Sequence, residues 1–115
     1  MKIVIITNDP PYGTERTYNA FRTASHLIKR EDVEVNLFLM ADAVASALPN
    51  QKTPDGYYNL QKMLVIIARK AKVGACGSCL DARGLGTLEL IHNVNRSSME
   101  ELTDWILQSD KLITF

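Results

Sequence analysis

Two cysteines, Cys76 and Cys79, are the side chains of this 115-residue chain best suited to chemistry. They lie in the segment VGACGSCLDARGLG, where a glycine directly follows Cys76 and an Arg-Gly pair stands seven and eight residues after it. A thiolate is a nucleophile and a metal ligand. The pair is therefore suited to four roles: a disulfide staple, half of a metal site, a redox dithiol or a carrier of sulfur.

The first two roles are disfavoured. A bridge between residues three apart closes so small a loop that it constrains the unfolded chain little. A zinc site needs three or four ligands, usually a second CxxC or a pair of closely spaced histidines. The two histidines, His26 and His92, stand far apart in the chain. We expect no metal site.

The sequence CGSC resembles a thioredoxin-type redox motif, but the rest of the chain does not fit that fold. All four prolines precede Cys76, so no later proline can face the cysteines. Arg83-Gly84 also predicts that the helix after Cys76 ends within about two turns. The thioredoxin fold is disfavoured, while dithiol redox chemistry stays open.

Hydrophobic patterning predicts the elements that must position the cysteines. Strands are expected at Lys2 to Thr7, Val33 to Met40, Val73 to Ala75 and Lys111 to Phe115, and helices at Thr14 to Arg30, Asp42 to Leu48, Leu60 to Ala71 and from a capping box at Ser98 to Glu101. Leu88 to Val94 fits either a strand or a helical turn. The last helix is expected to bury Met99, Leu102, Trp105 and Ile106. Strands alternating with helices predict an α/β fold of three α/β/α layers around a mostly parallel sheet.

In such a sheet, the loops at the carboxyl ends of the strands share one edge, where ligands bind. Cys76 is expected at this edge, reachable by solvent and readily ionised. The loop of residues 8–13 would lie nearby, which makes Asn8 and Tyr12 candidate substrate-binding residues. Loop structure alone explains both residues equally well.

Composition sets the broad class of protein. The length suits a single domain over residues 1–115. The formal net charge is zero, which gives no support for direct binding of nucleic acid or of a membrane surface. The start of the chain has no signal-peptide pattern, so we expect a cytoplasmic protein. Gly84-Leu85-Gly86 is no dinucleotide fingerprint and no Walker motif occurs, so no cofactor is expected.

A family resemblance joins these features. The N-terminal strand with its loop TNDPPYGTE, the pattern C-x6-R-G at Cys76, Arg83 and Gly84, and the closing EELTDWILQSDKLITF resemble the DsrE/DsrF-like family of sulfur-relay proteins. This resemblance covers nearly the whole chain. It implies a homo-oligomer, such as a trimer or hexamer, that exchanges sulfur with donor and acceptor proteins.

By position, Cys76 matches the cysteine that carries sulfane sulfur as a persulfide in that family. Cys79 is then either a resolving thiol, which attacks the persulfide and releases sulfide, or a small buried hydrophobe. Arg83 is a candidate for stabilising the anion. Seven residues of helix rise about 10 Å, so Arg83 reaches Cys76 only if the segment folds back or a neighbouring subunit supplies the contact. Two alternatives remain: a non-catalytic oligomeric scaffold of the same fold, and a dithiol redox protein.

Overall fold

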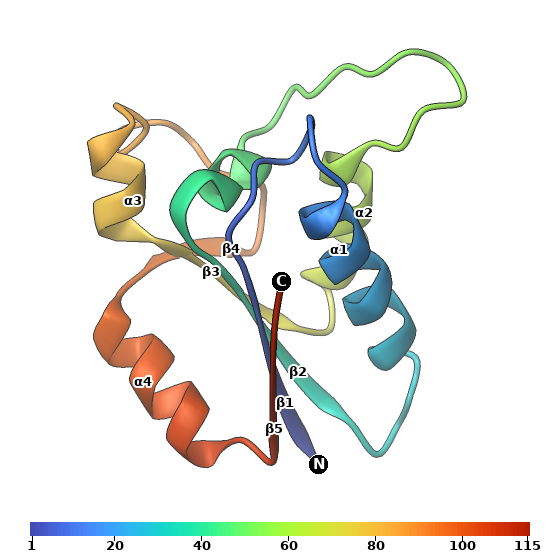
Figure 1. The fold of residues 1–115 in the computed structure, drawn as a ribbon, viewed down its shortest axis with the longest axis vertical. Coiled ribbons are helices and arrows are strands. Elements are labelled where there is room, and N and C mark those ends of the chain that lie inside the picture. Colours follow the sequence, from blue (N-terminus) through green and yellow to red (C-terminus); the bar gives the residue numbers. More distant parts are fainter.

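The computed structural model describes residues 1–115 as a five-stranded parallel sheet with helices on both faces (Figure 1). The elements in chain order are β1 (Lys2–Thr7), α1 (Arg16–Leu27), β2 (Glu34–Leu39), the 3-10 helix η1 (Ala41–Ala47), α2 (Leu60–Ile67), β3 (Lys72–Cys76), α3 (Gly77–Ala82), β4 (Val94–Ser97), α4 (Met99–Gln108) and β5 (Lys111–Thr114). Their order across the sheet is β4-β3-β2-β1-β5. No helix is both long and apolar enough to cross a membrane.

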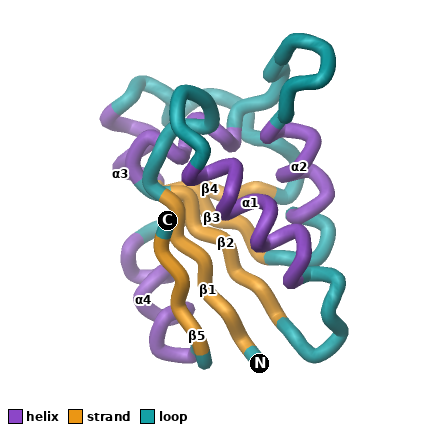
Figure 2. The backbone as a smooth tube through the Cα atoms, turned by 45° about the vertical axis from the view of Figure 1, so that its right-hand side comes forward, coloured by secondary structure: helices purple, strands orange, loops and turns teal.

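The order of the strands explains the layers. From β1 to β4 the chain adds each strand on the same side of the last, so right-handed connections keep α1 and α2 on one face of the sheet. After β4 the chain returns to the opposite edge, where β5 pairs with β1. This reversal places α4 on the other face, as Figure 2 shows. The predicted three-layer α/β/α fold is confirmed.

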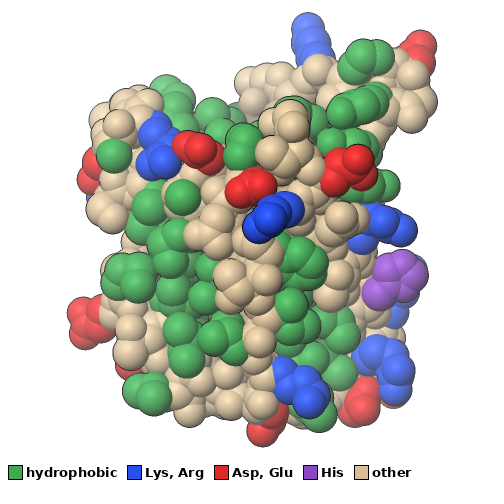
Figure 3. Space-filling model, in the orientation of Figure 1, with side chains coloured by type: hydrophobic (Ala, Val, Ile, Leu, Met, Phe, Trp, Pro, Cys, Tyr) green, Lys and Arg blue, Asp and Glu red, His purple; other side chains and the backbone are tan.

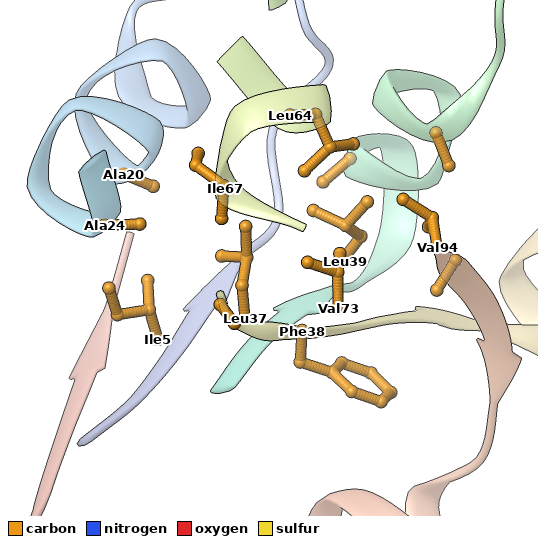
Figure 4. Close-up of a cluster of buried hydrophobic side chains, with 14 of the residues drawn as sticks. Ile5, Ala20, Ala24, Leu37, Phe38, Leu39, Leu64, Ile67, Val73 and Val94 are labelled. Carbon is orange, nitrogen blue, oxygen red and sulfur yellow. The ribbon is translucent and has the colours of Figure 1, made fainter. Parts of the chain in front are cut away.

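The main core lies between the sheet and the helices α1 and α2. Ile5, Leu37 and Val73 point from neighbouring strands toward Leu64 and Ile67 of α2 (Figure 4). All five side chains are buried. Continuous apolar strands suit a sheet that is covered on both faces.

The second face is covered by α4 through Trp105. Its indole ring meets the ring of Phe38 edge-on, with centroids 6.0 Å apart. A Cβ on Gly74 would lie 3.2 Å from this indole and 2.9 Å from the Cβ of Ser97. Gly74 therefore allows β3 to approach both α4 and β4 closely.

The last third of the chain departs from the sequence prediction. The strand β4 begins at Val94, the last residue of the segment Leu88 to Val94 where a strand or helical turn is expected. Its sequence VNRS buries only Val94, so it has no apolar pattern from which a strand could be predicted. The side chain of Ser98 accepts the N–H of Glu101, so the predicted start of α4 is correct. The Glu101 carboxylate, however, accepts the hydroxyl of Ser97 and does not complete the box. Met99 is 53% exposed and does not belong to the buried face of α4.

Candidate functional site

Cys76 is the last residue of β3 and directly precedes α3, at the carboxyl edge of the sheet. This is the expected position, but only 2% of the residue is exposed. The expectation that solvent reaches its sulfur is wrong for the isolated chain. The chain enters α3 immediately after Cys76, and Ser78 in the first turn of that helix lies against the sulfur.

The surroundings of the Cys76 sulfur are polar. Its Sγ lies 3.3 Å from the hydroxyl of Ser78, and the Cys79 thiol and the backbone N–H groups of Ser78 and Cys79 are placed to favour its ionised form. Burial opposes ionisation and is the largest single influence on this thiol, but the hydrogen bonds together outweigh it. The pKa of Cys76 is therefore lowered from its ordinary value.

Cys79 has the opposite tendency. Burial and the hydrogen bond to Cys76 raise the pKa of Cys79, although the N–H of Ala41 donates to its Sγ at 3.3 Å. The two thiols interact, and these opposite shifts favour loss of the first proton from Cys76 and its retention on Cys79. This arrangement supplies a nucleophile and, within reach, a thiol that can give up a proton. Both cysteines are free, and no three His, Cys, Asp or Glu side chains are grouped as metal ligands would be.

Arg83 is bound to groups other than the Cys76 sulfur. Its Nε donates to Asp42 Oδ1 at 2.9 Å, and its Nη1 donates to the carbonyl oxygen of Cys79 at 3.0 Å. Arg83 therefore joins the end of α3 to η1. Its charge favours ionisation of Cys79.

Asn8 and Tyr12 lie at the same edge of the sheet but contact other partners. Asn8 Nδ2 donates to the carbonyl of Phe115 at 3.0 Å, while the Tyr12 hydroxyl donates to Gln51 at 2.7 Å and accepts from the N–H of Leu60 at 3.1 Å. Strand β2 and the helix η1 separate them from β3. Two strand spacings amount to about 10 Å. Tyr12 instead joins a stack made by all four tyrosines of the chain, centred on Tyr58.

The cation that packs beside Cys76 is Arg96, which the sequence analysis did not single out. Arg96 stands opposite Ala75 in the β3–β4 register, one residue before Cys76. Its guanidinium lies against Gly77 and binds Asp81 of α3 through two hydrogen bonds of 2.8 and 2.7 Å. Asp81 is the main reason that the pKa of Arg96 is raised, and the charge of Cys76 adds to this effect. A single arginine in a short polar strand gives no sign in the sequence that its side chain lies beside Cys76.

The site is thus a thiol of lowered pKa at the end of an inner strand of a parallel α/β sheet, next to a second thiol and a cation held by an ion pair. Comparison with known proteins identifies the group of proteins to which this structure belongs. The model of the DsrE/DsrF-like family matches residues 1–115. The chain belongs to the DsrE/DsrF-like family, as its resemblance indicated.

Individual proteins also resemble this chain over its whole length. Protein YchN of Escherichia coli (strain K12) is 44% identical over 116 residues, covering 99% of this chain and 98% of YchN. The uncharacterized protein MJ0989 of Methanocaldococcus jannaschii is 35% identical over 115 residues and all of both chains. The crystal structure of YchN superposes with a TM-score of 0.93 over 99% of this chain and 98% of that one. MTH1491 of Methanobacterium thermoautotrophicum, a protein of unknown function, shares the fold at 14% identity, with a TM-score of 0.76 over 99% of this chain and 97% of its own.

Proposed function

We propose that this protein carries sulfane sulfur as a persulfide on Cys76. The observation that supports this most directly is the polar surrounding of the Cys76 sulfur, with the Ser78 hydroxyl at 3.3 Å and the Cys79 thiol beside it, which favours the thiolate. A lowered thiol pKa increases the thiolate fraction at neutral pH, and the thiolate is the attacking species in sulfur exchange. Membership of the DsrE/DsrF-like family is consistent with a role in sulfur relay.

The proposed transfer is a balanced exchange. The Cys76 thiolate attacks the outer sulfur of a donor persulfide, so a bond forms between the two sulfurs while the S–S bond of the donor breaks and its thiolate leaves. The thiolate of an acceptor then attacks the outer sulfur on Cys76, and the Cys76 thiolate leaves. Because Cys76 is buried at the start of α3, the structure around it must open locally for either partner to react.

Cys79 supports a resolving step on the same site. Its thiol already lies in hydrogen-bonding contact with Cys76. Attack of the Cys79 thiolate on the inner sulfur of the Cys76 persulfide forms a Cys76–Cys79 disulfide and releases hydrosulfide. An external dithiol reductant is then needed to restore both thiols.

Intact-protein mass spectrometry after exposure to an inorganic polysulfide tests the carrier role. Wild type is expected to gain the mass of one sulfur atom, Cys76→Ser to gain none, and Cys79→Ser to keep the added sulfur longer than wild type. Equal gain by wild type and Cys76→Ser contradicts the proposal. No gain by wild type leaves the non-catalytic scaffold as the better interpretation.

A dithiol redox function is the second candidate, because the contact between the thiols and their opposite pKa shifts also suit disulfide formation. Titration against glutathione redox buffers distinguishes it. A Cys76–Cys79 couple with a potential in the cellular range favours redox function, whereas a pair that stays reduced throughout excludes it.

The proposal includes the setting in which the protein works. We propose that residues 1–115 form a single domain and that the protein is a homo-oligomer in the cytoplasm. It exchanges sulfur with donor and acceptor proteins and binds neither nucleic acid nor membrane directly. Exposed apolar side chains on α4 and β5, such as Leu107 and Leu112, support self-association. Figure 3 shows apolar side chains at the lower left and lower centre of the view, where α4 and β5 lie in Figure 1.

A further inference from the structure

Two glycines near Cys76 leave room for an ion pair. A Cβ on Gly77 would lie 2.8 Å from the Cζ and Nε of Arg96, and a Cβ on Gly86 would lie 2.1 Å from Asp81 Oδ1. Neither glycine has a positive φ, so backbone conformation does not require glycine at either position. Both glycines instead lie in close contact with the Arg96–Asp81 ion pair, Gly77 with Arg96 and Gly86 with Asp81. The pair lies in a slot that any larger residue at 77 or 86 would narrow.

The geometry of the pair is specific. Arg96 Nη1 donates to Asp81 Oδ1 at 2.8 Å, and Arg96 Nη2 donates to Asp81 Oδ2 at 2.7 Å. Two parallel hydrogen bonds fix orientation as well as distance. About half of each side chain is exposed, 50% for Arg96 and 56% for Asp81, and an exposed ion pair contributes little to global stability. The value of this pair therefore lies in what it holds in place.

The pair joins two elements that meet at Cys76. Arg96 belongs to β4 and stands opposite Ala75, while Asp81 belongs to α3. The helix α3 has only six residues, and its first turn supplies the N–H groups that bind the Cys76 sulfur. At its other end, Arg83 ties the helix to η1 through Asp42. Arg96 is thus the anchor of α3 on the side of β4.

We infer that Arg96 is a positioning residue for Cys76: through Asp81 and across Gly77, it clamps the first turn of α3 over the sulfur. The clamp keeps the N–H groups of that turn aimed at the thiolate and keeps the sulfur covered until α3 moves. This inference deepens the proposed function and rests on Cys76 as its reactive thiol. According to this inference, the two parallel hydrogen bonds of the Arg96 guanidinium, and not its charge alone, control access to the Cys76 sulfur.

The test compares Arg96→Gln with Arg96→Lys, because lysine keeps the charge but cannot form two parallel hydrogen bonds. The rate of Cys76 alkylation by iodoacetamide is measured against pH, with peptide mass spectrometry to assign the modified residue. The midpoint of the pH profile reports ionisation of Cys76, and the plateau rate at high pH reports access to the sulfur.

Both variants are expected to raise the plateau rate several-fold, and the midpoint is expected to move to higher pH as the N–H groups lose their alignment. Arg96→Lys with the midpoint and plateau of wild type overturns the clamp, since charge alone then suffices. Arg30→Gln removes a pair with Asp32 that lies away from the cysteines and serves as the matched control, with no change expected.

A second variant tests the clamp without removing either charge. Gly86→Ala places a methyl group against the Asp81 carboxylate and is expected to raise the plateau rate as Arg96→Gln does. An unchanged plateau in this variant, with circular dichroism like that of wild type, also overturns the clamp. These readouts need no sulfur donor, so failure of wild type to gain sulfur refutes the carrier role and leaves the result for the clamp standing.

Discussion

The two cysteines differ in their surroundings although they are only three residues apart. Cys76 accepts hydrogen bonds at the start of α3, whereas Cys79 donates to Cys76 and is partly buried beside η1. A donor stabilises the charged form of its acceptor. The identity of residue 79 therefore controls how readily Cys76 ionises, independently of any resolving chemistry.

Replacing Cys79 tests this control. In Cys79→Ala the thiol donor is lost, so the pKa of Cys76 is expected to rise. The thiolate fraction falls as pH falls below the pKa, so alkylation of Cys76 by iodoacetamide should titrate at higher pH in this variant than in wild type. Cys79→Ser keeps a hydroxyl donor and is expected to titrate near wild type. A wild-type midpoint in Cys79→Ala contradicts the assigned hydrogen bond.

At the scale of elements, the site depends on close packing around β3 and on the helices that follow the neighbouring strands. The strand β3 is inner, since β2 and β4 flank it, and α3, η1 and β4 meet around its carboxyl end. The helix α4 supports this arrangement from the other face, where Trp105 packs beside Gly74. Changes in α4 therefore affect the platform below the site and not the thiols themselves.

The N-terminal cap of α4 offers a defined change to this platform. Ser98→Ala removes the side-chain oxygen that accepts the N–H of Glu101, and is expected to lower the free energy of unfolding by about 1 kcal/mol. Urea denaturation followed by circular dichroism measures the change. Ser98→Asp keeps an acceptor at the cap and is the matched control, expected to unfold near wild type. Equal loss in both variants argues against the cap as the cause.

At the scale of the whole molecule, a net charge of zero conceals an uneven distribution. Residues 16–30 and 60–72, which contain α1 and α2, hold eight of the 13 lysines and arginines and no Asp or Glu. The helix α4 holds three acidic residues and no basic one. Lys29, Arg69 and Lys70 line a groove of about 380 Å³ between α1 and α2, which also has apolar walls. Leu107 of α4 is 80% exposed and lies on the same side of that helix as Glu100 and Asp104.

These surfaces predict how the proposed homo-oligomer responds to charge. If α4 of one copy packs into the groove of the next, Glu100→Lys with Asp104→Lys should lower the mass measured by sedimentation equilibrium. Adding Arg69→Glu and Lys70→Glu to the same chain should restore it, because attraction between unlike charges returns. Asp55→Lys with Glu89→Lys, in two exposed loops, is the control and should leave the mass unchanged. Failure of the fourfold variant to recover contradicts this mode of contact.

Much of this protein follows from local sequence. The apolar runs at β1 and β2, the helical spacing in α1 and α2 and the cap at Ser98 are short-range signals, and each matches an element of the structure. Because a parallel sheet gathers the carboxyl ends of its strands, the position of Cys76 at that edge also follows from the sequence. Family membership was likewise carried by local motifs.

What only the tertiary structure decided involves contacts between residues distant in the chain. The strand β4 has too few apolar residues to be recognised, and its register against β3 is what brings Arg96 to Cys76 across 20 positions of sequence. The same packing buries Cys76 and turns Arg83 toward Asp42. Local sequence determines which segments form strands and helices because propensity and periodicity act over a few residues, whereas the partners of each side chain depend on how those segments pack.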